Sequence, residues 1–225
     1  MPRKPAAPEG LSDKKALALE VIARLKKEYP DAACTLDYDH AWQLLVSVRL
    51  AAQCTDARVN IVVEDLFAKY PSVAALAAAE PEEIEAIVKP CGLGHSKARD
   101  ISACMRMLRD KYDCKVPTTF EELLSLPGVG RKSANLIMGD VFGKPAIVTD
   151  THCIRLCNKI GLVDGIKEPQ KVEMALWKII PPEEGSDLCH RFVMHGRAVC
   201  NARKPECEKC CLRDICRYAR ENAAT

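Results

Sequence analysis

The sequence predicts an all-α protein, and three features support this class. Aromatic residues make up only 5% of the 225 residues, whereas alanine and leucine are frequent, a composition that favours helices over sheets. Apolar residues recur at helical spacing in most segments, without an alternating strand pattern of useful length or an internal repeat. With 48% hydrophobic residues, the chain is able to bury a substantial core.

In the first half of the chain, capping residues and prolines set the expected helix limits. Ser12 is suited to cap a first helix that ends at Tyr29-Pro30, and Thr55 is suited to cap a helix closed by Pro71. Ser96 is the expected cap of a longer helix after a loop rich in glycine. The expected helices lie near residues 12–29, 41–50, 55–70, 72–79, 81–88 and 96–112.

In the second half, Thr119 begins a short helix that leads into the turn sequence of residues 126–130. A helix is expected from Arg131 to about Val141, and another follows Asp150 after a short extended stretch at residues 146–148. Two further helices are expected near residues 169–180 and 186–200. They lead into a terminal segment dense in cysteine and basic residues.

Two cations stand where the helix after residues 126–130 begins. A helix N-terminus carries a partial positive charge, so Arg131 and Lys132 destabilise the first turn unless an anion binds there. Gly128 and Gly130 permit positive φ and close backbone approach, so amide N–H groups can point outward together. This pattern predicts a phosphate site at the helix start. A tight turn between two helices, with no ligand, is the alternative.

Lys132 and Asp150 are the residues from which we expect chemistry. A lysine at a helix N-terminus, beside a second cation, should have a lowered pKa, and its free amine can form a Schiff base with an electrophilic carbon. Asp150 is suited to cap the helix that follows it, and a carboxylate there can also act as a base or stabilise a cation. Both roles are compatible if one oxygen caps. His152 is interpreted as a packed or capping residue.

The thirteen cysteines fall into two groups. Most are scattered, and their odd number without a signal peptide indicates reduced thiols in the cytosol. Four near the end form the pattern C-x6-C-x2-C-x5-C, namely Cys200, Cys207, Cys210 and Cys216. Gathered thiolates need a metal, and the spacing leaves zinc and a 4Fe–4S cluster equally open. Cys211 lies beside Cys210, so the sequence does not decide which of these two is a ligand.

Basic residues accompany these cysteines. The net charge of +2 is too small to indicate nucleic acid by itself, so a basic surface must come from clustering. Five cations lie in or beside the loops between the expected ligands: Arg203, Lys204, Lys209, Arg213 and Arg217. Such a metal-pinned loop suits a phosphate backbone, and a solvated basic face is the alternative.

The sequence does not indicate a membrane protein. The most apolar stretch, Leu44 to Ala52, is too short to span a bilayer and is interrupted by Arg49. Met1 to Gly10 is rich in proline and alanine and lacks a signal-peptide core, so it is expected to be a disordered tail. We therefore expect a cytoplasmic protein.

Three motifs together resemble the endonuclease III family of helix-hairpin-helix DNA glycosylases. They are residues 126–132, the Val148-Thr149-Asp150-Thr151-His152 stretch and the terminal cysteine pattern, and the resemblance extends from about Trp42 to Tyr218. It implies a bifunctional DNA glycosylase and AP lyase that acts on oxidised pyrimidines in double-stranded DNA. It further implies a 4Fe–4S cluster on the four cysteines, which decides the choice of metal, and a monomeric bacterial protein associated with the nucleoid.

The resemblance also implies two lobes and a set of site residues. A six-helix barrel would span residues 34–144, with the helix-hairpin-helix at about 119–141, and a cluster domain would combine residues 1–33 with 145–225. Lys132 would be the nucleophile and Asp150 the catalytic carboxylate. Gln53 matches a glutamine inserted into the duplex, and Leu93 matches an apolar wedge. The remaining matches in DNA binding are Asp56, at a polar position of the pocket, and Gly128, Gly130 and Arg131, in the hairpin.

Three other functions fit the sequence less well. A monofunctional adenine glycosylase would lack the nucleophilic lysine and carry a further C-terminal domain, whereas this chain has Lys132 and continues for only nine residues past Cys216. A non-catalytic DNA clamp would have no need for a lysine and aspartate pair. A zinc-dependent nuclease would require a histidine and carboxylate set with an open metal position, which the sequence lacks.

Overall fold

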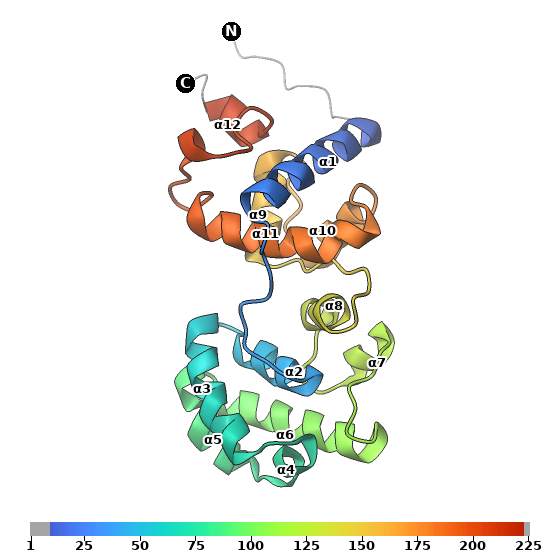
Figure 1. Cartoon of the computed structure of the whole chain (residues 1–225), viewed down its shortest axis with the longest axis vertical. Coiled ribbons are helices and arrows are strands. Elements are labelled where there is room, and N and C mark those ends of the chain that lie inside the picture. The colour runs from blue at the N-terminus through green and yellow to red at the C-terminus, as the bar shows by residue number, and fades with distance from the viewer. Residues whose placement is uncertain (1–9, 223–225) are drawn as a thin grey trace. The chain divides into compact units, whose positions relative to one another are not determined.

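The computed structural model describes residues 10–222, and this part of the chain is helical without a strand. The prediction of an all-α protein is confirmed. Most of the predicted tail, residues 1–9, lies outside the described residues, as do residues 223–225. The chain divides into two compact units, Cys34–Lys144 and the pair of segments Met1–Ala33 and Pro145–Thr225 (Figure 1).

The unit Cys34–Lys144 is built from helices around one apolar interior. Helix α6 packs against α2, α4 and α5, while α8 packs against α2 and α7. Fully buried leucines and methionine fill the interior, among them Leu44, Leu66, Leu76 and Met105. The helices are α2 (Ala41–Leu50), α3 (Asp56–Lys69), α4 (Val73–Ala78), α5 (Pro81–Val88), η1 (Lys89–Cys91), α6 (Gly94–Lys111), α7 (Phe120–Ser125) and α8 (Arg131–Asp140).

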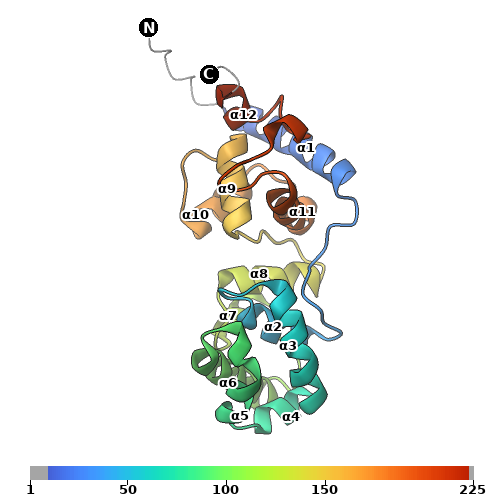
Figure 2. The ribbon, with the colours of Figure 1, turned by 90° about the vertical axis from the view of Figure 1, so that its left-hand side faces the viewer.

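The second unit joins the first described helix to the last part of the chain. Helix α11 packs against α1 and α9, and α12 packs against α9, as both views of the ribbon show (Figure 1 and Figure 2). Leu25, Leu156 and Phe192 are fully buried in this unit. Its helices are α1 (Leu11–Glu28), α9 (Thr151–Ile160), α10 (Pro169–Leu176), η2 (Pro182–Glu184), α11 (Gly185–Ala198), η3 (Cys207–Lys209) and α12 (Arg217–Asn222).

The predicted caps Thr55 and Thr119 are confirmed, whereas the predictions for Ser12 and Ser96 are wrong. The side chains of Thr55 and Thr119 each accept a hydrogen bond from a main-chain amide three residues later, both over 3.3 Å. Helix α1 begins instead at Leu11, with Gly10 as its cap rather than Ser12. Helix α6 begins at Gly94, and the hydroxyl of Ser96 donates to the carbonyl oxygen of Leu93 over 3.1 Å. Leu93, whose backbone is left-handed, takes the cap position three residues before Ser96.

Two smaller features complete the fold. Residues 146–148, expected to be an extended stretch, are buried and form no strand in the described chain. The short helix α12, which directly follows Cys216, was not predicted. Within residues 10–222, no helix is both long and apolar enough to cross a lipid bilayer.

Candidate active site and cysteine centre

The turn sequence 126–130 forms the connection between α7 and α8, and its two glycines have different conformations. Gly128 has φ of +75°, the left-handed region that glycine favours. Gly130 has φ of −100° and ψ of 178°, an extended conformation open to any residue, and it precedes α8 as its cap. The expectation that both glycines supply positive φ therefore holds for Gly128 only. A Cβ atom at Gly130 would meet nothing within 4 Å, so the approach to the start of α8 is open.

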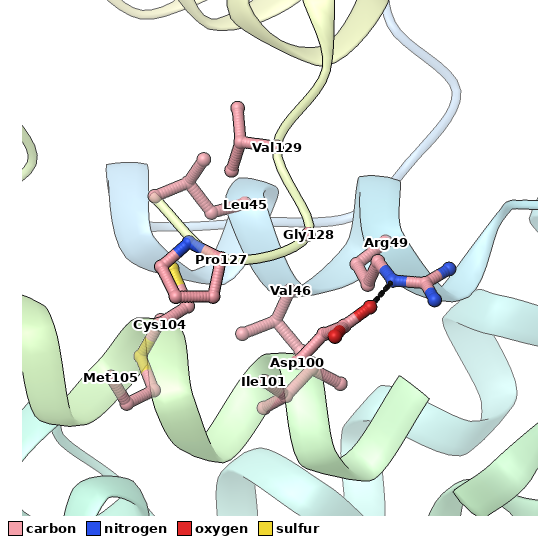
Figure 3. Close-up of a pocket in the computed structure, with 10 residues that line it drawn as sticks. All are labelled: Leu45, Val46, Arg49, Asp100, Ile101, Cys104, Met105, Pro127, Gly128 and Val129. Carbon is pink, nitrogen blue, oxygen red and sulfur yellow. Dashed lines mark hydrogen bonds and ion pairs between the residues drawn. The ribbon is translucent and has the colours of Figure 1, made fainter. Parts of the chain in front are cut away.

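Gly128 lies against an ion pair that joins α2 to α6. The Nε atom of Arg49 donates to Oδ2 of Asp100 over 2.7 Å, as Figure 3 shows. A Cβ atom at Gly128 would come within 2.9 Å of Asp100 Cβ and 3.1 Å of Arg49 Cδ, so only glycine allows this close approach. The hairpin is thereby seated on both helices. The sequence signal for this seat was Arg49 itself, a charge inside an otherwise apolar run.

Helix α8 begins at Arg131, so Arg131 and Lys132 lie in its first turn as predicted. The guanidinium carbon of Arg131 lies 4.9 Å from the centre of the Phe120 ring, which connects α8 to α7 through a cation–π contact. Lys132, the next residue, is exposed. Gly130 gives α8 no side-chain cap, and a helix start without a cap offers its first amide groups to an anion.

Asp150 caps α9 in the other unit, so its predicted capping role is confirmed. Its Oδ1 atom accepts a hydrogen bond from the amide of Cys153 over 2.7 Å, and the residue is half-buried. His152 is packed, as expected: its Nδ1 atom lies 3.1 Å from Nη2 of Arg155. A Cβ atom at Gly196 would come within 2.4 Å of that same Nδ1, so the glycine makes room for the ring.

Gln53 and Leu93 share an uncommon backbone conformation. Their φ angles are +56° and +51°, values rare for residues other than glycine. Both side chains are exposed, and Leu93 keeps 55% of its surface in contact with solvent. Asp56 lies in the first turn of α3, where its Oδ2 atom accepts a hydrogen bond from the hydroxyl of Thr35 over 2.5 Å.

The four cysteines of the terminal pattern lie near one another. All thirteen cysteines are free thiols. Burial raises the pKa of the Cys200 thiol against the opposing charges of Lys159 and Arg155, and the neighbouring Cys216 and Cys207 add smaller contributions in the raising direction. Among residues 10–222, no three histidine, cysteine, aspartate or glutamate side chains converge closely enough to hold a single metal ion. The four thiols therefore lie near one another without converging on a single metal position.

The surroundings distinguish Cys210 from Cys211. The Sγ atom of Cys210 accepts a hydrogen bond from the amide of Leu212 over 3.4 Å and lies 3.3 Å from Nε2 of His195. Burial raises the pKa of Cys210 to about 12, with smaller contributions from neighbouring cysteines. Cys211 instead offers its carbonyl oxygen to Arg24 over 3.0 Å. A donor aimed at sulfur is the usual surrounding of a thiolate ligand, so Cys210 fits a metal or cluster better than Cys211.

Three of the five basic residues around the cysteines form ion pairs. Lys209 and Arg213 form ion pairs of 2.5 Å with Glu206 and Glu208, respectively. Arg217 pairs with Asp164 over 2.6 Å. The other two cations of this group, Arg203 and Lys204, are exposed residues in the segment between α11 and η3. These two are therefore the cations of the group best placed to meet a phosphate backbone.

Comparison with known proteins agrees with this arrangement. Residues 46–182 match the HhH-GPD superfamily of base excision DNA repair proteins. Endonuclease III of Synechocystis is 44% identical over 207 residues, which cover 92% of this chain and 94% of the relative. Endonuclease III of Escherichia coli is 37% identical over 204 residues, covering 91% and 96% of the two chains.

Solved structures lead to the same family. A non-covalent endonuclease III–DNA complex superposes with a TM-score of 0.88 at 40% identity, covering 94% of this chain and 99% of that one. A trapped endonuclease III–DNA covalent intermediate has the same TM-score and identity, over 93% and 98% of the chains. The resemblance inferred from the motifs is confirmed. The chain is a base excision DNA repair enzyme that belongs to the endonuclease III family, within the HhH-GPD superfamily.

Proposed function

We propose that this protein is a bifunctional DNA glycosylase and AP lyase that removes oxidised pyrimidines from double-stranded DNA, with Lys132 as nucleophile. The observation that carries the proposal is the position of Lys132, exposed in the first turn of α8 and directly after a glycine hairpin with an open face. A phosphate of the DNA bound at this helix start would hold the strand beside the amine.

In the proposed reaction the damaged nucleotide is first flipped out of the duplex. The unprotonated amine of Lys132 attacks C1′ of the sugar, the bond from C1′ to the base breaks, and the base leaves with its bonding electrons and takes up a proton. Opening of the sugar ring gives a protonated imine between Lys132 and C1′. Loss of a proton from C2′ then expels the 3′ phosphate by β-elimination, and water hydrolyses the imine to release the enzyme.

Asp150 would supply the carboxylate for this reaction. Its role is to take a proton from the lysine or to stabilise positive charge on the sugar. The observed cap supports such a dual use, because the hydrogen bond from Cys153 engages Oδ1 and the carboxylate has a second oxygen.

Gln53 and Leu93 would fill the space that the flipped nucleotide leaves. An apolar side chain at the tip of a loop is suited to wedge between bases, and an amide can pair with the base left without a partner. Their exposure supports this role. Gly128, Gly130 and Arg131 would hold the DNA backbone, with Asp56 at the edge of the pocket for the damaged base.

The four cysteines would hold a 4Fe–4S cluster. Cys200, Cys207, Cys210 and Cys216 provide four thiolate ligands once the metal displaces their protons. When bound, the cluster would pin the terminal segment and hold its exposed cations, Arg203 and Lys204, in place. We further propose that the two compact units are a barrel domain and a cluster domain, and that the protein acts as a monomer in the cytoplasm on nucleoid DNA.

Covalent trapping tests the proposed chemistry. Borohydride should reduce the imine and link the wild-type protein to a duplex carrying thymine glycol or an abasic site. Lys132→Ala should abolish the link, while binding to the duplex persists because the phosphate contacts remain. Trapping of the variant at the wild-type level would overturn the assignment of Lys132. Absence of trapping with the wild type on every lesion tested would overturn the lyase function and would favour a non-catalytic DNA-binding protein.

A further inference from the structure

Lys97, in the first turn of α6, is completely buried. Lysine is seldom buried to this extent, because removing the ammonium from water is unfavourable. Burial accordingly lowers the pKa of Lys97. Its Nζ atom donates hydrogen bonds to two main-chain carbonyl oxygens, that of Leu50 over 2.7 Å and that of Cys91 over 2.9 Å.

These two carbonyls terminate helices that are far apart in the sequence. Leu50 is the last residue of α2, and Cys91 is the last residue of η1. Carbonyl groups at a helix end lack partners within the helix and carry partial negative charge, which favours a cation. A single buried side chain therefore joins the ends of both elements.

The two loops that leave these carbonyls carry Gln53 and Leu93. Each loop reaches its exposed, left-handed residue within three positions of the carbonyl that Lys97 holds. The main chain of Lys97 also fixes the second loop, because its amide donates to the carbonyl oxygen of Leu93 over 3.0 Å. Lys97 thus contacts the Leu93 loop through both its side chain and its main-chain amide, and the Gln53 loop through its side chain alone.

A second contact shows that the two loops meet. Burial first, and then the adjacent Cys54 thiol, raises the pKa of Cys91 to about 11. Cys54 directly follows Gln53, and Cys91 lies two residues before Leu93. The loops are therefore neighbours in the same unit, and Lys97 lies beneath both.

We propose that Lys97 is a positioning residue that holds Gln53 and Leu93 in a fixed relation, so that both enter a damaged duplex as a pre-ordered pair. This inference rests on the proposed function, since it takes these two residues as the ones inserted. Order established before binding removes the entropy loss of ordering two loops on the DNA. The benefit arises only where a nucleotide has left the stack, because an intact duplex is held through its phosphates.

The test compares two duplexes of one sequence, one intact and one carrying a tetrahydrofuran residue as an uncleavable abasic analogue. Lys97→Met keeps a long unbranched side chain in the core and removes the donor. Its affinity for the abasic duplex should fall about tenfold, the effect expected when one or two hydrogen bonds that order the loops are lost. Its affinity for the intact duplex should stay at the wild-type value, which also shows that the variant is folded.

Two further proteins make the test specific. Lys144→Met is the matched control, because the Nζ atom of Lys144 also donates to a main-chain carbonyl, that of Thr118 over 2.6 Å, and it should leave both affinities unchanged. In a Gln53→Ala, Leu93→Ala background, Lys97→Met should cause little further loss, since its effect acts through those side chains. If Lys97→Met does not fold, Lys97→Gln, which keeps a shorter donor, takes its place.

The outcomes separate this inference from the proposed function. An equal loss on both duplexes, no loss on either, or a full loss in the double-alanine background would overturn the positioning role. A wild-type protein that does not prefer the abasic duplex would instead overturn the proposed recognition of damaged DNA, and this inference with it.

Discussion

Arg49 and Asp100 form an ion pair between α2 and α6, and the backbone of the hairpin rests on this pair at Gly128. We predict that Gly128→Ala lowers the free energy of unfolding by about 2 kcal/mol, because alanine is strained at positive φ and its methyl group collides with the pair. Chemical denaturation of the two proteins measures this difference. A change near zero would show that the hairpin can shift away from Arg49 and Asp100 without loss of stability.

Gly130→Thr is the control for that measurement and a test of the phosphate site. The position is extended and open, and threonine is a good helix cap, so stability should change by less than about 0.5 kcal/mol. The added side chain occupies the open face, so affinity should fall for any duplex, damaged or intact. Unchanged affinity would contradict a phosphate site at the start of α8.

Asp150 offers a separation of structural and chemical roles. Asp150→Ser retains an oxygen that can cap α9, so its stability should stay close to the wild type, whereas Asp150→Ala should lose about 1 kcal/mol. Both variants lack the carboxylate and should lose glycosylase activity to a similar degree. Thermal unfolding and single-turnover rates measure the two properties independently. Activity that follows stability across the pair would indicate that Asp150 serves the fold alone.

The neighbouring thiols Cys210 and Cys211 should respond differently to serine. Cys210→Ser removes the sulfur that receives the Leu212 amide, so the purified protein should lose most of its iron. Cys211→Ser should keep the wild-type iron content. Iron and sulfide analysis after anaerobic purification decides between them. Zinc without iron in the wild type would reject the cluster, and iron loss in Cys211→Ser alone would exchange the two assignments.

Asp164 links three parts of its unit, through Lys14 of α1 and Arg217 of α12. The hydrogen bonds from Lys14, and then from Arg217, lower the pKa of Asp164 below its usual value. Because the folded pKa is lower than the unfolded pKa of about 4, the ionised carboxylate stabilises the fold above the unfolded pKa. This contribution is lost as the pH falls through the folded pKa. The carboxylate is largely exposed, so the contribution should not exceed about 1 kcal/mol. Denaturation of Asp164→Asn should show this loss at pH 7, and the difference from the wild type should shrink as the pH falls through the folded pKa of Asp164 and the wild-type carboxylate loses its charge.

Much of the fold is predictable because the helix signals are local. Thr55 and Thr119 cap their helices as expected, and the apolar run at residues 41–50 forms α2. The errors at Ser12 and Ser96 have one cause, since a serine that can cap does not do so when the backbone before it already permits an earlier helix start. Gly10 and Leu93 took the capping positions instead.

The candidate site likewise contains residues that the sequence reveals and residues that only the structure reveals. Residues proposed to act through their own chemistry, such as Lys132, stand out by type and neighbours in the sequence. Lys97 does not, because a lysine in a predicted amphipathic helix is expected on the surface. Its partners are main-chain carbonyls, which every residue has, so no pairing of side chains reveals it. Arg49 and Asp100 lie 51 residues apart in the sequence, and only the packing of α2 on α6 joins them.

The left-handed backbone at Gln53 and Leu93 has a consequence for engineering. Glycine at either position would relieve backbone strain of about 1 kcal/mol, so a screen for thermal stability alone should enrich it there. The same replacement would remove the side chain proposed to enter the DNA. Consensus or stability-guided redesign of this enzyme should therefore hold both positions fixed, because they are places where a more robust protein would be a less capable one.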